Sequence, residues 1–301
     1  GAIFFRHLSG LQASLRRMAA AGDLTGSGVL VNLKTLYILK SKYKEECKMR
    51  RSHLLASLSG LAAATFMASA AHAVTLKAAT DPSFVPFEML DQESGEMVGF
   101  DIDILNAIGE RAGFDIDLKT MDFNGIIPAV QTGSVDVAIA GITITEAREK
   151  IVDFTDPYYD SGLQILTSAN NGDIEDIEGL EGKKIGTKIG STSYDYLTAN
   201  LGDSTITPYP GSADMYMALI SGSVDAVFYD APNVGYFAKT KGNGRVKTVG
   251  PLYEGQQYGI AFTEGSEWTE AANKALAEMK SDGSYAEIYQ KWFGAMPGDS
   301  Q

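Results

Sequence analysis

The sequence has few residues of the types that most enzymes and disulfide-stabilised secreted proteins use. Its 301 residues contain one cysteine, Cys47, and three histidines, which are His7, His53 and His72. From Val74 onward the chain therefore lacks the usual soft metal ligands and nucleophiles, and we expect no metal, no cofactor and no catalytic residue. Without disulfides this part must be stabilised by a hydrophobic core, which a chain of this length can supply.

Basic charge is also scarce beyond the N-terminal segment. Residues 1–73 carry 10 Lys and Arg against 3 Asp and Glu, which leaves 15 against 35 for residues 74–301. A strongly acidic body repels phosphate, and no basic stripe with interleaved aromatic residues is present. We therefore expect no nucleic-acid partner.

Residues 49–73 have the organisation of a secretory signal peptide. Arg50 and Arg51 precede an apolar run at 54–70, and Ala71-His72-Ala73 stands before Val74. This pattern predicts export of the protein and cleavage after Ala73. A membrane anchor would need about 20 strongly apolar residues, whereas this run is short and rich in Ala and Ser. Residues 1–48 are expected to lie outside the mature protein. Cys47 precedes the signal peptide and is not at its cleavage site, which disfavours a lipoprotein anchor.

One short segment has the composition of a carboxylate receptor. Residues 140–148 read Ala-Gly-Ile-Thr-Ile-Thr-Glu-Ala-Arg after an apolar run. The guanidinium of Arg148 matches a carboxylate, and the Thr143 hydroxyl and free N–H groups at a strand end can donate to the same oxygens. By itself the segment is only suggestive, because an Arg after a Thr-rich turn is usually solvated.

An internal repeat strengthens this interpretation. Residues 131–141 recur as 220–230, and residues 76–81 recur as 183–188. The first pair places Gly141 and Asp230 at matching strand ends, and the second does the same for Asp81 and Lys188. Ligands bind outside the carboxyl ends of strands in open α/β sheets, so two tandem α/β units would face each other across a shared cleft.

Periodicity and turn residues predict the following elements. Strands are expected at 76–79, 114–119, 163–167, 184–187, 205–207 and 226–229. Helices are expected from Asp101 or Asp103, as the N-cap, to about 111, and at 125–131, 194–199, 213–221, 233–240, 267–280 and 285–293. Strand-like crossings at 158–162 and 255–259 would make lobe 1 discontinuous, with residues 74–158 and 258–301, and lobe 2 an insertion of residues 159–257. Such a double connection suits a hinge.

Several motifs in the chain resemble those of a known protein family. They are Ala79-Thr80-Asp81, Phe84-Val85-Pro86-Phe87-Glu88, Val98-Gly99-Phe100-Asp101, Met121-Asp122-Phe123, residues 125–129, residues 140–145, residues 256–262 and Lys291-Trp292-Phe293-Gly294. Over residues 75–297 the chain resembles the periplasmic amino-acid-binding proteins of ABC importers, solute-binding protein family 3, and among them the glutamine binders. The resemblance implies a bilobed periplasmic-binding-protein fold of two α/β lobes. It would close on one amino acid and deliver it to a membrane permease.

The resemblance also implies roles for individual residues. The amino-acid head group would be held by Arg148, Thr143 and the backbone N–H of Ser191 or Thr192 at its carboxylate, and by Asp230 and the Gly141 carbonyl at its ammonium. The ligand side chain would lie between Phe84 and Phe123, with Asp81 and Lys188 at its polar end. A neutral amide suits that pair, since Asp81 accepts from the NH₂ and Lys188 donates to the C=O.

Two positions depart from the pattern of the glutamine binders. Tyr229 stands where they have His, and Ser191-Thr192 stands where they have Thr-Gly. Serine keeps the hydroxyl, while Thr192 reduces backbone freedom. The loss of His weakens the assignment to glutamine and leaves the assignment to an α-amino acid intact.

Simpler interpretations stand beside these. Phe123 could be a core residue, whereas Phe84 lies in a proline-rich turn, which argues against the core. Asp81 and Lys188 could be surface charges, and Asp122, Asp136 and Asp225 are most simply solvated. Tyr158 and Tyr159 are expected to pack at the hinge.

The leading hypothesis is a monomeric, non-enzymatic receptor for free L-glutamine or a related polar amino acid. One rival is an amino-acid-like dehydratase or lyase with Asp81 or Lys188 as the acid or base. Another is a ligand-sensing domain, which would need a transmembrane helix after Gln301.

Overall fold

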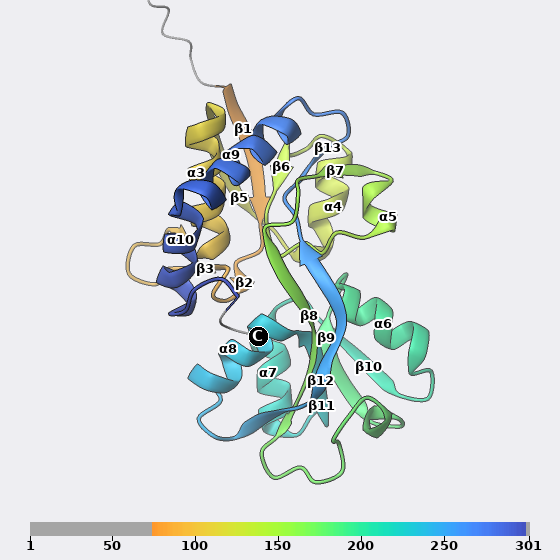
Figure 1. The fold of residues 1–301 in the computed structure, drawn as a ribbon. Helices are drawn as coiled ribbons and strands as arrows, with labels where there is room; N and C mark the ends of the chain where they lie inside the picture. The colour runs from red at the N-terminus through yellow and green to blue at the C-terminus, as the bar shows by residue number, and fades with distance from the viewer. Residues whose placement is uncertain (1–73, 299–301) are drawn as a thin grey trace, which may run out of the picture. The chain divides into compact units, whose positions relative to one another are not determined.

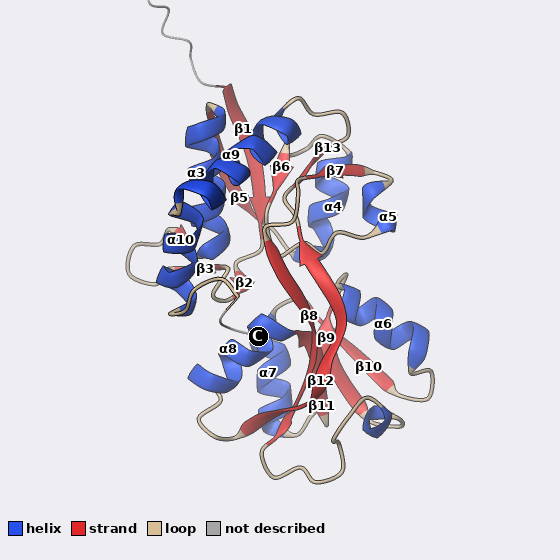
Figure 2. Ribbon diagram, in the orientation of Figure 1, coloured by secondary structure: helices blue, strands red, loops and turns tan. Residues whose placement is uncertain are grey.

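The structure, a computed structural model, describes residues 74–298, so the predicted signal peptide and upstream segment lie outside the described residues. In this part of the chain two five-stranded mixed sheets form the centres of two α/β lobes (Figures 1 and 2). The expected bilobed α/β fold is confirmed. Within residues 74–298 no helix combines the length and apolarity that crossing a bilayer requires.

The first sheet has the order β5-β1-β6-β13-β7. Its strands are β1 (Val74–Thr80), β5 (Phe114–Thr120), β6 (Val137–Ala138), β7 (Val152–Phe154) and β13 (Ala261–Thr263). The helices of this lobe are α3 (Phe100–Ala112), α4 (Phe123–Gln131), the short α5 (Glu146–Glu149), α9 (Trp268–Asp282) and α10 (Ser284–Phe293). Alternate residues of a strand face opposite sides of the sheet. Ala78 accordingly joins the core that contains residues of α3 and α9, while Ala79 joins the core under α4.

The second sheet has the order β10-β9-β11-β8-β12. Its strands are β8 (Tyr159–Ser168), β9 (Lys184–Lys188), β10 (Thr205–Tyr209), β11 (Ala226–Asp230) and β12 (Val246–Tyr258). The helices are α6 (Thr192–Asn200), α7 (Ser212–Ser221) and α8 (Ala231–Thr240), with one 3₁₀ turn at Glu178–Leu180. A small third sheet joins β2 (Ser83–Phe84), β3 (Glu88–Leu90) and β4 (Met97–Val98), and the sequence patterns did not indicate it.

The internal repeat is visible in the strand register. Ala78 pairs with Val137 in the first sheet, and the matching residues Ile185 and Ala226 pair in the second. Each repeat also carries the same side-chain hydrogen bond. The Lys77 amide donates to Asp136 at 2.8 Å, and the Lys184 amide donates to Asp225 at 2.8 Å. Asp225 is exposed and Asp136 partly exposed, as expected, and each carboxylate in addition ties the turn before its strand to the neighbouring strand.

Two connections pass between the sheets within the described residues. Residues 155–158 lead from β7 to β8, and residues 259–260 lead from β12 to β13. β8 and β12 lie side by side as antiparallel strands, with Tyr159 opposite Tyr258 (Figure 1). The exact lobe boundaries, and hinge motion about these connections, stay a prediction.

The expected N-cap of α3 was wrong. The cap residue is Gly99, at φ 146°, where a Cβ would lie 1.9 Å from the Phe87 carbonyl oxygen. Asp101 instead points into the interior, and Asp103 pairs with Lys291 at 2.6 Å. Gly113 ends the helix in the left-handed conformation, close to the predicted end at about residue 111.

Candidate functional site

The matching strand ends bring Asp81 and Lys188 together. Asp81 follows β1, Lys188 ends β9, and the Lys188 ammonium lies 2.5 Å from the Asp81 carboxylate. The two side chains are only 3% and 1% exposed. They are therefore a buried ion pair between the lobes, and the surface-charge interpretation was wrong. Burial of two charges is costly unless they are paired and hydrogen-bonded, which makes this pair a candidate site feature.

Ser83 completes the surroundings of this pair. Its backbone N–H and its hydroxyl donate to Asp81 Oδ1 at 2.8 and 2.6 Å, and its hydroxyl oxygen accepts from Lys188 Nζ at 2.7 Å. Phe123 lies beside both cations of the region, with its ring centre 5.7 Å from Lys188 Nζ and 5.6 Å from Arg148 Cζ. The half-buried ring can thus form a wall between the two charged groups.

The Arg148 guanidinium spans the two lobes. It donates to the Thr143 carbonyl at 2.8 Å and to the Gly190 carbonyl at 3.1 Å. The short helix α5 positions Arg148, and its N-cap Thr145 accepts from the Arg148 amide. Burial lowers the pKa of Arg148, while the nearby Asp230 and Asp195 carboxylates raise it. The guanidinium stays charged, and both of these hydrogen bonds go to backbone carbonyl groups.

Two threonines from opposite lobes converge on one hinge-strand residue. The hydroxyls of Thr143 and Thr192 each donate to Gln256 Oε1 at 3.1 Å. These three residues also border a surface hollow that includes Tyr196. Neighbouring Ser191 caps α6: its hydroxyl accepts from the Tyr194 amide and donates to the Lys188 carbonyl at 2.7 Å. Gln256 belongs to one of the family motifs, but no role for it was predicted from the sequence.

Asp230 is held by a tyrosine that sequence reasoning also missed. The Tyr258 hydroxyl donates to Asp230 Oδ2 at 2.5 Å and accepts from Ser161 at 2.8 Å. Burial raises the pKa of Asp230 to about 6, although the Tyr258 hydrogen bond and the charges of Arg148 and Lys188 lower it. A buried carboxylate with partial compensation is well suited to a cationic partner.

Gly141 is held in place from two sides. Its φ is 56°, and a Cβ on it would lie 2.4 Å from the Phe84 ring. Its N–H donates to Asp101 Oδ2 at 2.9 Å, and the Tyr158 hydroxyl donates to the same oxygen at 2.8 Å. Burial raises the pKa of Asp101 to about 6, while these hydrogen bonds lower it. Glycine is required here because the aromatic ring packs directly on its α-carbon.

Phe84 is a buried core residue, so the expectation drawn from its proline-rich turn was wrong. It is 2% exposed, and its ring centre lies 5.9 Å from that of Tyr229 and 6.0 Å from that of Tyr258. Tyr229 is buried as well, which raises the pKa of its hydroxyl. Tyr158 is buried and Tyr159 partly buried, and both belong to the aromatic cluster at the connections between the lobes. The turn carries Phe84 inward, where its ring packs against Tyr229 of β11 and Tyr258 of β12.

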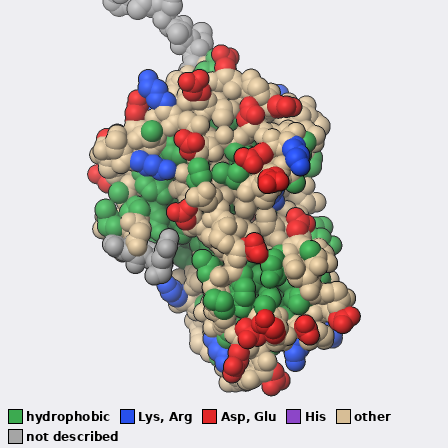
Figure 3. Space-filling view, turned by 45° about the vertical axis from the view of Figure 1, so that its right-hand side comes forward, with side chains coloured by type: hydrophobic (Ala, Val, Ile, Leu, Met, Phe, Trp, Pro, Cys, Tyr) green, Lys and Arg blue, Asp and Glu red, His purple; other side chains and the backbone are tan. Residues whose placement is uncertain are grey.

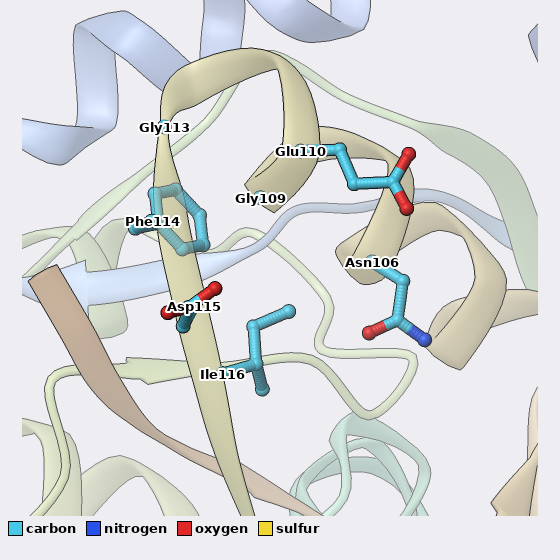
Figure 4. Close-up of a pocket in the computed structure, with 7 residues that line it drawn as sticks. All are labelled: Asn106, Gly109, Glu110, Gly113, Phe114, Asp115 and Ile116. Carbon is cyan, nitrogen blue, oxygen red and sulfur yellow. The ribbon is translucent and has the colours of Figure 1, made fainter. Parts of the chain in front are cut away.

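Other surface features lie apart from this cluster. A hollow between the end of α3 and the start of β5 contains none of the predicted site residues, and is lined by Asn106, Gly109, Glu110, Gly113, Phe114, Asp115 and Ile116 (Figure 4). Acidic side chains are spread over the face seen in Figure 3. Within residues 74–298 no group of three or more His, Cys, Asp or Glu side chains could hold a metal ion.

Several residues predicted from sequence lie at the ends of strands and the starts of helices: Asp81 follows β1, Lys188 and Asp230 end β9 and β11, and Phe123 and Thr192 begin α4 and α6. Residues 76–295 match the bacterial extracellular solute-binding proteins, family 3. The chain belongs to this family. The resemblance noted from the sequence motifs is confirmed at this level.

Curated relatives and solved structures cover the same region. The chain is 34% identical to the ABC transporter glutamine-binding protein GlnH of Bacillus subtilis, over 71% of this chain and 79% of the relative. It is 32% identical to the ABC transporter arginine-binding protein 1 of Escherichia coli, over 77% of this chain and 96% of the relative. An ancestral arginine-binding protein, solved with glutamine and with arginine, is 44% identical with a TM-score of 0.70, covering 73% of this chain and 98% of that one.

One solved structure bears on the enzymatic alternative. An ancestral amino-acid-binding protein, described as a precursor of cyclohexadienyl dehydratase, is 34% identical with a TM-score of 0.68. It covers 73% of this chain and 95% of that chain. The chain therefore shares its fold with a binding protein that is described as the precursor of an enzyme.

Proposed function

We propose that this protein is the periplasmic binding component of an ABC amino-acid importer. The protein is a monomer that binds one free L-amino acid, with glutamine preferred. It closes its two lobes on this ligand and delivers the ligand to a membrane permease. The names of the curated relatives support transport of an amino acid. The predicted signal peptide supports the location.

The amino-acid head group would be bound by residues of both lobes. Arg148 and the Thr143 hydroxyl take the carboxylate, together with the backbone N–H of Ser191 or Thr192 at the start of α6. Asp230 and the Gly141 carbonyl take the ammonium. The buried Asp230 supports this role, because its carboxylate has one tyrosine partner and can accept further hydrogen bonds.

The observation that carries the preference for glutamine is the buried ion pair of Asp81 and Lys188. Phe123 lies beside Lys188. An extended ligand side chain would therefore run from the head-group site past Phe84 and Phe123 to the ion pair. A neutral carboxamide offers an acceptor to the ammonium and donors to the carboxylate. An added net charge would leave one member of the pair opposed in a site with little solvent.

Arginine is the second candidate, because relatives are named as arginine-binding and a relative was solved with both ligands. The fully buried Lys188 ammonium disfavours a guanidinium at this position, since two cations would share one carboxylate. Tyr229 stands where the glutamine binders have His, so the preference between glutamine and arginine is tested by measuring the affinity for both.

Calorimetry with the twenty amino acids tests the proposal. One ligand should bind tightly with a stoichiometry of one, and mass spectrometry of the denatured protein should identify the same molecule if it co-purifies. Absence of heat for every amino acid would contradict the receptor function. A preference for arginine over glutamine would contradict the specificity alone.

The enzymatic alternative has a separate test. Asp81 and Lys188 are engaged with one another and with Ser83, which favours recognition over proton transfer. Mass spectrometry of a ligand incubated with the protein should recover it unchanged. Product formation that Lys188→Met abolishes would instead establish a dehydratase or lyase.

A further inference from the structure

A three-residue segment of lobe 1 accepts hydrogen bonds from three separate elements of lobe 2. Lys188 at the end of β9 donates to the Ser83 hydroxyl at 2.7 Å. Ser212 at the start of α7 donates to the Ser83 carbonyl at 2.5 Å. Asn233 in α8 donates through its amide nitrogen to the Val85 carbonyl at 2.7 Å. The segment therefore serves as a shared acceptor across the lobe boundary.

The two donors on α7 and α8 are held in position within lobe 2. Ser212 and Asn233 are 5% and 2% exposed. The Tyr216 hydroxyl donates to Asn233 Oδ1 at 2.5 Å, so the amide NH₂ must face the other way, toward Val85. A buried amide with both ends engaged is a preorganised donor, since losing the Val85 carbonyl would leave its nitrogen without that partner.

Ser83 also belongs to the surroundings of the ion pair. Its hydroxyl donates to Asp81 Oδ1 at 2.6 Å while it accepts from Lys188, and its own carbonyl accepts from Ser212. Ser83 thus contacts the ion pair that is proposed to bind the end of the ligand side chain, and it also contacts Ser212 across the lobe boundary. The Ser212 hydrogen bond is therefore connected to the ion pair through a single residue, Ser83.

We propose that residues 83–85 form a closure latch in which Ser83 couples recognition of the ligand side chain to docking of the two lobes. This inference rests on the proposed function for the identity of the ligand, whereas the latch itself rests on the three interlobe hydrogen bonds. The Ser212 and Asn233 bonds hold the closed state, and the Ser83 hydroxyl positions Asp81 and Lys188. Slow ligand release follows from the first part, and side-chain discrimination from the second.

The two parts predict different effects. Ser212→Ala removes one bond of the latch and keeps the ion pair, so the dissociation rate should rise about threefold to tenfold, the range for one neutral hydrogen bond, with the ranking of amino acids unchanged. Asn233→Asp keeps the acceptor for Tyr216 and opposes a carboxylate to the Val85 carbonyl, and should accelerate dissociation further. Ser83→Ala should alter the ratio of affinities for glutamine and arginine.

Stopped-flow fluorescence measures the rates, with Ser223→Ala as the matched control because this serine of lobe 2 is exposed and does not contact the segment. Lobe closure is measured separately in the full chain without ligand. Spin labels at Glu110→Cys and Asp203→Cys, both exposed and on different lobes, are introduced in a Cys47→Ser background. The closed population should decrease in the Ser212→Ala and Asn233→Asp proteins.

The outcomes separate the latch from the receptor function. Equal label distances in the variants and the parent would overturn the latch, whatever ligand the protein binds. A parent protein that binds no amino acid but whose closed population falls in the variants would contradict the proposed function and support the latch. Unchanged ligand ratios in Ser83→Ala would overturn the coupling role of Ser83.

Discussion

The hydroxyl of Tyr258 donates a hydrogen bond of 2.5 Å to the carboxylate of Asp230. Tyr258 is the last residue of the strand that leads from lobe 2 back to lobe 1. The other connection has an equivalent contact, in which Tyr158 donates to Asp101 at 2.8 Å. Each connection between the lobes therefore ends in a buried tyrosine that holds a carboxylate next to the candidate site.

Replacing Tyr258 by Phe should weaken amino-acid binding. The change removes the hydrogen bond to the carboxylate and leaves the ring in place. A bond of this kind to a charged group contributes about 1.5–3 kcal/mol, which corresponds to roughly a tenfold to hundredfold loss of affinity. Calorimetry measures the loss, and Tyr253→Phe is the matched control on the same strand. Equal affinities of the two variants would show that Tyr258 does not organise Asp230.

Affinity should decrease as the pH falls below about 6. The pKa of Asp230 is raised to about 6, mainly by burial, and the ligand ammonium requires the ionised carboxylate. A proton competes with the ligand below this pKa, so affinity should fall by up to about tenfold for each further pH unit. The Asp230→Asn protein should bind weakly, without this acidic decline. The same decline in both proteins would assign it to another group.

Asp101 should make the free energy of unfolding decrease as the pH rises. A salt-bridged carboxylate, whose pKa is lowered, has the opposite effect. Burial raises its pKa from 3.8 to about 6, so the folded protein holds this proton more tightly than the unfolded chain. The stabilising contribution of protonation is full below about 3.8 and is lost as the pH rises through 6, a difference of about 3 kcal/mol at most. Asp101→Asn keeps the acceptor oxygen and should reduce this pH dependence in urea unfolding between pH 4 and 7. An unchanged slope would show that other groups cause it.

Gly141→Ala should destabilise the protein and abolish binding. The added methyl group would lie 2.4 Å from the Phe84 ring in a backbone of φ 56°. Gly133→Ala is a close control, because φ is 70° there and no atom lies within 4 Å of the added Cβ. It should show only the cost of a left-handed alanine, about 1 kcal/mol. Equal thermal shifts for the two variants would show that Phe84 moves away freely.

Head-group and side-chain recognition should be separable by two substitutions. Arg148→Ala removes the guanidinium and should abolish binding of every α-amino acid. Lys188→Met removes the donor to the ligand side chain and should change the preference among amino acids instead. Because it also leaves Asp81 buried without its cation, a shift toward basic ligands is expected. Unchanged selectivity in a calorimetric panel would contradict the role of Lys188.

Local patterns in the sequence were sufficient for most of the framework. The strand and helix periods placed the long helices and most of the central strands, although they missed residues 246–254 of β12. The repeat at 131–141 and 220–230 correctly indicated two units with the same strand register. These features are local because hydrophobic periodicity, glycine stops and turn residues act over a few positions. The proximity of Asp81 and Lys188 also agrees with the sequence, since the carboxyl ends of the strands of the two units were expected to face each other across a cleft.

The tertiary structure alone decided the environments of the polar residues. Asp101 has the sequence position of a helix cap, yet it is buried and accepts from Gly141 and Tyr158, which lie 40 and 57 positions away. Tyr258, Gln256 and Ser83 gained their roles in the same way, through contacts with residues far along the chain. Burial and long-range hydrogen bonding depend on how the lobes fold back on each other, and no short pattern contains that information. The sequence by itself therefore determined the two lobes and the charges at their strand ends, while the packing of those lobes determined which groups hold them.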